Sequence, residues 1–245
     1  MKNCAVLFCS LLLGALTLSS CDNSKTEDVF EEINGNVKEK FIKRVDVSDL
    51  YQENSTITIN YDGQNRVSSI SDGTSSKFFN YSSSSGELNL ISGYSNGYDI
   101  NISDFYLAPY DAFDKGEVLV FDNNGNPTKI LAFEDGYNSA SLIGEIFYDN
   151  KPNPYFYTLK AAKFIDILDR TEFNFGYQNP KIMKAKQLLP FNNISGMIFK
   201  NSNGITKYEA HFDYDYNADG YPISAIVTAL DESGANTYTI NYFYK

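Results

Sequence analysis

The only histidine of the chain lies between two acidic residues in an alternating segment. His211 has Glu209 and Asp213 two positions away on either side. In an extended strand, residues two apart share a face, so the three side chains are expected to point the same way. Imidazole and carboxylate groups bind Zn²⁺ or Fe²⁺, so a ligand from another strand would complete a metal site. An ordinary solvated strand face has the same alternation, and that is the alternative interpretation.

A second group of oxygen-bearing side chains follows directly. Asp215, Asn217 and Asp219 alternate before Gly220, as in the first half of a calcium-binding loop. A complete loop would carry a bidentate glutamate at its twelfth position, which Ile226 occupies. Asn, Asp and Gly are also typical of a tight hairpin turn. A partial calcium site and a hairpin turn are therefore both predicted, and the turn is favoured.

The remaining residues offer little for catalysis. A Ser-His-Asp arrangement would have to use His211, because the chain has one histidine. A phosphate loop and a dinucleotide fingerprint are lacking, so the sequence predicts no cofactor. With 31 Asp and Glu residues, any single carboxylate pair is uninformative about glycoside hydrolysis. An acidic-residue hydrolase, metal-assisted or not, with its site near His211 is the alternative to a non-catalytic module.

The amino-terminal segment predicts export and a lipid anchor. Lys2 precedes an apolar run over residues 5–16, which is the layout of a signal peptide. The run is too short to cross roughly 30 Å of hydrocarbon comfortably. Leu, Ser and Ser stand before Cys21 and resemble a lipoprotein processing box, so residues 1–20 are expected to leave and Cys21 to carry lipid. The alternative is an ordinary secreted protein that is cleaved elsewhere.

Cysteine use and charge limit the partners. Cys4 and Cys9 lie in the predicted signal, so the mature chain keeps only the lipidated cysteine and has no disulfide. The formal net charge is −11, and it becomes about −12 when the signal leaves with its single lysine. Lys and Arg are scattered singly, which excludes nucleic acid and disfavours anionic membrane surfaces as partners. Contact with the membrane is therefore expected through the lipid.

Three segments divide the chain. Residues 1–20 are the predicted signal, residues 21–40 a flexible acidic tether, and residues 41–245 a single β domain. The stretch Lys25-Thr26-Glu27-Asp28, which ends in two acidic residues, resembles the surface-export signal of Bacteroidetes-type lipoproteins. A charged linker has the same composition, so the periplasmic and extracellular faces of the outer membrane both stay open.

Period-two alternation dominates the third segment. Residues 57–61, 208–216 and 237–244 alternate apolar or aromatic side chains with polar ones. That pattern is typical of half-buried antiparallel strands. Charged residues such as Lys129 and Lys207 close to these strands favour a soluble body over a membrane-spanning barrel.

A recurring ten-residue pattern predicts hairpins. Each copy has an aromatic, then Asp or Asn, then turn-forming residues, with Val or Pro six positions after the aromatic. The copies span residues 61–70, 121–130, 148–157 and 216–225. Successive hairpins predict a mainly β fold, an antiparallel meander forming a curved sheet or open barrel.

One segment interrupts the β pattern. Leu and Ile residues recur at helical spacing over residues 158–170, and a second helical stretch is expected from Pro180 to Leu189. One or two short helices are thus predicted around residues 158–190. They would cap the sheet or act as a lid over a cleft.

These motifs resemble a known family. The hairpins look like the YD-type repeats of bacterial surface proteins. Together with the processing box, residues 148–154 and the Tyr-rich last strand, they resemble Bacteroidetes lipoproteins of unknown function with a porin-like β fold. The resemblance implies a fold and a location, and it assigns no catalytic residue. We therefore expect an exported lipoprotein of the outer membrane, with a non-catalytic module that binds a glycan, peptide or protein partner.

Overall fold

The structure is a computed structural model. It describes residues 37–49, 54–93, 100–102, 116–133, 141–170, 172–174, 182–184 and 189–245. The predicted signal peptide, the lipidation site Cys21 and residues 21–36 of the predicted tether lie outside the described residues.

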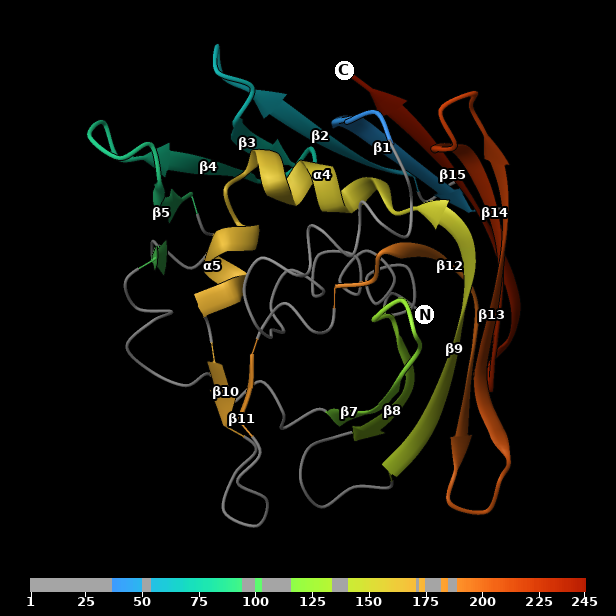
Figure 1. Cartoon of the computed structure of the whole chain (residues 1–245). Helices are drawn as coiled ribbons and strands as arrows, with labels where there is room; N and C mark the ends of the chain where they lie inside the picture. The colour runs from blue at the N-terminus through green and yellow to red at the C-terminus, as the bar shows by residue number, and fades with distance from the viewer. Residues whose placement is uncertain are drawn as a thin grey trace.

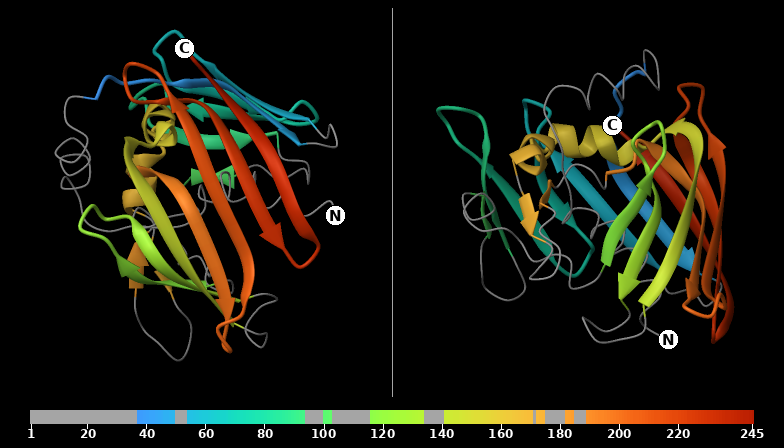
Figure 2. Two further views of the ribbon diagram at one scale, coloured as in Figure 1. Left: turned by 90° about the vertical axis from the view of Figure 1, so that its right-hand side faces the viewer. Right: turned by 60° about the horizontal axis from the view of Figure 1, so that its bottom comes forward.

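One antiparallel sheet dominates the described part of the chain. It holds 13 strands in the order β6-β5-β4-β3-β2-β1-β15-β14-β13-β12-β9-β8-β7. The strands are β1 (Ile42–Asp49), β2 (Ser55–Tyr61), β3 (Val67–Ser71), β4 (Ser76–Tyr81), β5 (Leu88–Ser92), β6 (Ile100–Asn101), β7 (Gly116–Phe121), β8 (Pro127–Phe133), β9 (Ser141–Pro152), β12 (Asn192–Asn201), β13 (Thr206–Tyr216), β14 (Pro222–Asp231) and β15 (Gly234–Tyr244). The sheet curves around two helices, and β6 and β7 end it without pairing to each other (Figures 1 and 2). The predicted mainly β, open antiparallel meander is confirmed.

The insertion between β9 and β12 differs from its prediction in detail. Helix α4 (Pro154–Ala161) starts four residues earlier than expected, because the Asn153 side chain accepts from the Tyr155 amide at 3.0 Å and caps it. Lys163 has a φ of 57°, which ends this helix before α5 (Ile165–Arg170) begins. The insertion therefore has two short helices, as the wider prediction allowed.

The second predicted helix, from Pro180 to Leu189, is wrong. Ile182–Lys184 form strand β11, which pairs antiparallel with β10 (Glu172–Asn174). Backbone groups that a helix would have satisfied locally bond across these two strands instead. A short stretch with helical spacing is weak evidence, and here tertiary pairing decides the structure.

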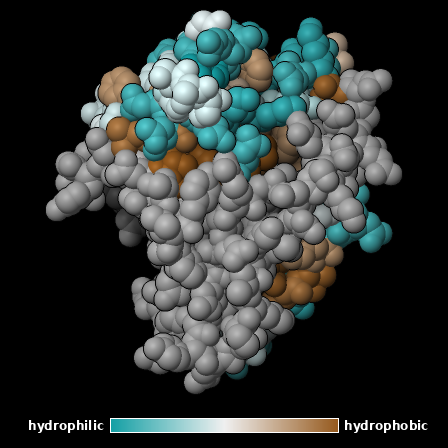
Figure 3. All heavy atoms as spheres, turned by 60° about the vertical axis from the view of Figure 1, so that its left-hand side comes forward, coloured by the Kyte–Doolittle hydropathy of each residue, from teal (hydrophilic) through white to brown (hydrophobic). Residues whose placement is uncertain are grey.

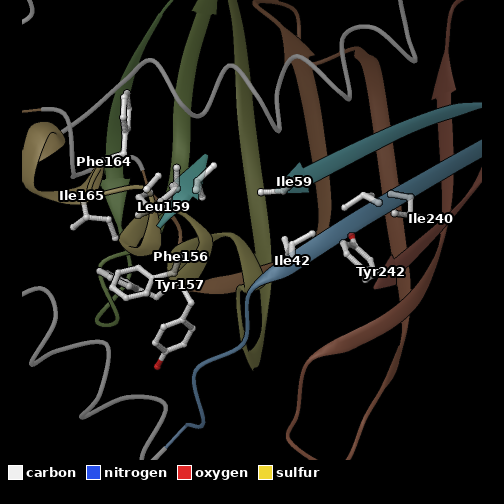
Figure 4. Close-up of a cluster of buried hydrophobic side chains, with 14 of the residues drawn as sticks. Ile42, Ile59, Phe156, Tyr157, Leu159, Phe164, Ile165, Ile240 and Tyr242 are labelled. Atoms are coloured by element: carbon white, nitrogen blue, oxygen red, sulfur yellow. The ribbon is translucent and has the colours of Figure 1, made fainter. Parts of the chain in front are cut away.

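The core lies between the concave face of the sheet and the helices. Phe156, Tyr157 and Leu159 of α4 are buried, and the sheet contributes buried residues such as Ile42 and Tyr242 (Figure 4). Strand β14 illustrates the alternation. It buries Ala225, Val227 and Ala229 and exposes the residues between them. This arrangement leaves the convex face of the sheet as solvent-exposed surface.

Four hairpin turns share one set of hydrogen bonds. The first residue of each turn is Asp or Asn, and its side-chain Oδ1 accepts from the amides two and four positions later. Its own amide donates to the carbonyl four positions later, and its carbonyl accepts from the amide three positions later. These first residues are Asp62, Asp122, Asn201 and Asn217. The third of them was not part of the predicted repeat.

One predicted hairpin is wrong. Residues 148–157 do not turn back, because β9 continues to Pro152 and α4 follows from Pro154. Asp149 instead accepts from the amides of Lys151 and Asn193 at 2.8 and 3.2 Å. The same residue types that would turn a hairpin here join the end of a strand to the cap of a helix.

Tyrosine hydroxyls join neighbouring strands of the sheet near the ends of those strands. Each of five tyrosines donates to a main-chain carbonyl in or beside another strand, at 2.6 to 2.9 Å. The donor–acceptor pairs are Tyr61–Ile42, Tyr81–Val67, Tyr148–Pro127, Tyr214–Ile194 and Tyr244–Pro222. Tyr81 also reaches the Ala162 carbonyl at 3.3 Å, which joins the sheet to the end of α4.

We expect Tyr81→Phe to lower the free energy of unfolding by about 1 kcal/mol or more, since it leaves a half-buried carbonyl without its donor. Tyr221→Phe is the matched control. Its hydroxyl is fully buried and has no hydrogen-bond partner among the described residues, so its loss should be neutral or stabilising. Urea unfolding of both variants measures the difference. Equal losses would contradict the role given to the Tyr81 hydroxyl.

Candidate functional site

The three residues singled out for metal binding lie on the convex face of β13. Cross-strand pairing places Glu209, His211 and Asp213 on this face, so their predicted shared orientation is confirmed. His211 Nε2 lies 3.2 Å from Asp213 Oδ1, and these side chains are 64% and 73% exposed. Glu209 makes no ion pair within the described residues.

The described residues contain no group of three or more His, Cys, Asp or Glu side chains arranged to hold a metal ion. The histidine pairs with Asp213 alone, and both groups face open solvent. Solvated ligands of this kind are a poor substitute for the enclosed, oriented set of a catalytic metal centre. Metal binding by Glu209, His211 and Asp213 stays a prediction.

The oxygens of the calcium-like turn have separate partners. Asn217 Oδ1 accepts from the amides of Asp219 and Tyr221 at 2.9 and 3.1 Å. Asp215 Oδ2 accepts from the Ser224 hydroxyl at 3.0 Å. Asp219 Oδ2 lies 2.6 Å from Lys40 Nζ, and this hydrogen bond and charge lower the pKa of Asp219. These contacts favour the hairpin interpretation, and calcium binding by this turn stays a prediction.

Two rings flank a glycine beside the histidine. Gly196 of β12 pairs with His211 on one side and with Phe147 of β9 on the other. A Cβ at Gly196 would lie 3.7 Å from Phe147 Cδ2 and 4.0 Å from His211 Nδ1, both ordinary contacts. The Ala210 carbonyl oxygen lies 3.4 Å from the same Cβ position, and Gly196 itself is buried, so its main chain is covered.

Exposed apolar side chains lie on the other side of β13. Ile226 pairs with Asp213, and Leu230 pairs with Glu209. Phe147, Ile226 and Leu230 are 49%, 52% and 47% exposed. We call this surface the outer-face patch, and it consists of Phe147, Glu209, His211, Asp213, Ile226 and Leu230. No helix or strand lies over it in the view onto β12 to β15 (Figure 2, left).

On the opposite side of the molecule, hydrophilic side chains gather along the upper rim, with apolar side chains directly below them (Figure 3). Thr228 separates Ile226 from Leu230 along β14, and exposed large apolar side chains that gather on one face of a sheet are typical of interaction surfaces. Alternation predicted the polar members of the patch. It could not predict Phe147 or Ile226 as their neighbours, since this depends on the pairing register.

A buried asparagine network lies away from the patch, and the sequence reasoning missed it. Asn126 and Asn192 are fully or almost fully buried, and Asn126 Nδ2 donates to Asn192 Oδ1 at 3.0 Å. Asn193 contacts Asp149, which also accepts from the Tyr216 hydroxyl. The network joins the β7–β8 turn to the starts of α4 and β12, and its polar atoms pair with one another. The adjacent asparagines at 192 and 193 were the available sequence signal.

A nucleophile-elbow spacing was also missed. Gly-x-Ser-x-Gly occurs once, at residues 93–97. An elbow needs a strand followed by a helix, whereas β5 pairs antiparallel with β6 across this connection. Residues 94–99 lie outside the described residues. The strand context is therefore that of a β-hairpin connection.

Comparisons with known proteins give distant likenesses. No family model and no curated protein matches the chain. A porin-like protein from Bacteroides vulgatus is 12% identical with a TM-score of 0.40, over 84% of this chain and 99% of that one. One from Bacteroides uniformis is 8% identical with a TM-score of 0.38, over 83% and 96%. A LolA superfamily protein from Nitrosomonas europaea is 10% identical with a TM-score of 0.29, over 89% and 90%. Likenesses this distant carry no information on activity or ligands.

Within the described residues, no helix is long and apolar enough to cross a membrane.

Proposed function

We propose that the protein is an exported lipoprotein of the bacterial envelope, held at the outer membrane by lipid on Cys21, and that its β domain is a non-catalytic binding module. The outer-face patch carries the second part of this proposal. Its apolar side chains are about half exposed on a rigid sheet, beside charged groups that lack enclosure. Such a surface suits contact with a partner.

The hydrolase alternative is disfavoured by the same exposure. A general acid or base needs a substrate positioned within hydrogen-bond reach, in a site that limits water. His211 and Asp213 are more than half exposed, and Glu209 is not brought to them by an ion pair. The observation that separates the two functions, a closed pocket or open solvent, therefore supports binding.

The contacts of residues 37–40, which lead into the β domain, are consistent with attachment of the domain through the amino terminus. Residues 37–40 are the last four of the predicted tether, and they lie against the domain. Lys40 pairs with Asp219 at 2.6 Å, and Glu39 pairs with Lys160 of α4 at 3.3 Å. The 15 residues between Cys21 and Val37 would let these two residues lie at most roughly 55 Å apart. The domain would thus stay close to the membrane with its convex face available.

Labelled-lipid incorporation in cells tests the anchor. We expect Cys21→Ala to abolish labelling, while Cys9→Ala, a cysteine in the predicted signal, keeps it. Protease treatment of intact cells then decides which side of the outer membrane carries the domain. Labelling that persists in Cys21→Ala would refute lipidation at this residue.

A further inference from the structure

The charge of the outer-face patch narrows the class of partner. The outward face of β13 carries the patch residues Glu209, His211 and Asp213 at two-residue spacing. Asp215, which lies just outside the patch, continues this spacing. These four residues form a line of three carboxylates and one imidazole, with about 6.6 Å between successive members. The apolar side chains of Ile226 and Leu230 run along one side of this line.

The described Lys and Arg side chains leave the negative charge of these carboxylates largely without a compensating positive charge. Asp213 contacts His211, and Asp215 accepts from the Ser224 hydroxyl. The nearby lysines have other acidic partners, because Lys200 lies 3.7 Å from Glu145 and Lys207 pairs with Glu232. Glu209 has no ion pair within the described part of the chain. The patch therefore presents negative charge between apolar side chains.

Negative charge beside exposed apolar side chains favours some classes of partner over others. The chain carries a net charge of −11, so a second copy and polyanions such as nucleic acid would be repelled. A neutral glycan would need aromatic stacking faces, and the chain has no Trp and only one exposed ring, Phe147, in the patch. A polypeptide with both basic and apolar side chains can satisfy both parts of the surface at once.

We infer that the outer-face patch binds a basic, amphipathic polypeptide segment. Its Lys or Arg side chains pair with Glu209, Asp213 and Asp215, and its apolar side chains contact Phe147, Ile226 and Leu230. In an extended segment, alternate residues share a face at the same spacing as the carboxylates on β13. This inference rests on the proposed binding function and specifies its partner.

Fluorescence anisotropy with defined peptides tests the inference. The full mature lipoprotein, held in nanodiscs of uncharged lipid, is titrated against a labelled peptide of alternating Lys and Leu. Two control peptides alternate Lys with Gly and Glu with Leu. We expect the Lys-Leu peptide to bind about tenfold or more tightly than either control, and to weaken at high salt because the charges are exposed.

Matched variants locate the binding surface. We expect Glu209→Gln and Ile226→Ser each to weaken binding of the Lys-Leu peptide severalfold. The control variants make the same changes in turns outside the patch. Glu87→Gln lies in the β4–β5 connection, and Ile205→Ser lies in the β12–β13 turn, where each residue is exposed.

The outcomes distinguish this inference from the function on which it rests. Equal binding of the three peptides, or equal effects of patch and turn variants, would overturn the basic amphipathic partner. A panel of neutral oligosaccharides is tested in the same way. Binding of an oligosaccharide that Phe147→Ala abolishes would overturn the partner class and keep the binding module. Cleavage of any probe over time, lost in His211→Ala, would overturn the non-catalytic function itself.

Discussion

Raising the pH above 10 is expected to unfold the β domain in one steep transition, during which its tyrosines ionise together. Burial raises the pKa of eight described tyrosines above the ordinary value of 10.0. They are Tyr61, Tyr81, Tyr148, Tyr214, Tyr216, Tyr221, Tyr242 and Tyr244. Five of them donate the carbonyl hydrogen bonds at the strand ends.

The direction follows from proton counting. Between pH 10 and the raised values, the folded chain keeps protons that the unfolded chain has lost, so stability falls as the pH rises. Below pH 10 both states are protonated, and the contribution of these groups is fully present. Each of these tyrosines removes up to about 1.4 kcal/mol of stability per pH unit, and less where solvent screens a partly exposed hydroxyl such as that of Tyr216. Several acting together exceed a typical stability of about 5–15 kcal/mol within roughly two pH units.

Phenolate absorbance and circular dichroism, recorded in the same alkaline titration, check this expectation. The two signals should change together, and the phenolate signal of these tyrosines should lag behind that of free tyrosine. Removing one buried hydroxyl, as in Tyr244→Phe, should make the transition less steep. Ionisation near pH 10 with an unchanged far-ultraviolet spectrum would show that these hydroxyls are accessible in the folded state.

The second large effect is expected at Asn126. This side chain is fully buried, and its Oδ1 accepts from the amides of Phe191 and Asn192 at 2.7 and 3.3 Å. Its Nδ2 donates to Asp122 Oδ2 and to Asn192 Oδ1, both at 3.0 Å. Asn126→Ala would leave these buried groups without partners, at about 1–3 kcal/mol for each group. We expect a loss of about 3 kcal/mol or more in the free energy of unfolding.

A neighbouring asparagine provides the control for this prediction. Asn123 lies in the same turn, and its side chain is exposed. Asn123→Ala should change the stability by less than about 0.5 kcal/mol. Urea unfolding of the two variants gives the comparison. Similar stabilities would mean that the network contributes little, and that the insertion is held at the end of β9 by apolar packing alone.

Sequence periodicity predicted the fold class because it reports on local geometry. The alternation over residues 208–216 reappears as β13, with Phe212 buried and Asp213 exposed. The turn-forming residues predicted the positions of the hairpins less reliably than the alternation predicted the strands. Asn201 opens a turn with the same hydrogen bonds as Asp62, although no aromatic precedes it, whereas the predicted hairpin copy at residues 148–157 leads into a helix. The same side chains suit a turn and a helix cap, and tertiary contacts decide between them.

The candidate site shows the same limit. The shared face of Glu209, His211 and Asp213 follows from period two alone. Their neighbours follow from which strands pair and in which register, and Phe147 is more than 60 positions from His211 along the chain. Such long-range pairing is invisible to a single sequence. The local part of the site was therefore predictable, and the apolar part required the structure.

The pairing of the first strand with the last determines when the domain can finish folding. Strand β15 lies between β1 and β14, and Lys245, the residue that follows it, donates its amide to the Phe41 carbonyl. Strand β1 comes first in the chain, and its partner β15 comes about 190 residues later, so β1 cannot complete its pairing until β15 is available. The centre of the sheet thus closes only when β15 inserts between β1 and β14. A chain that lacks β15 would therefore carry two half-sheets with no strand between them, each with an unpaired edge.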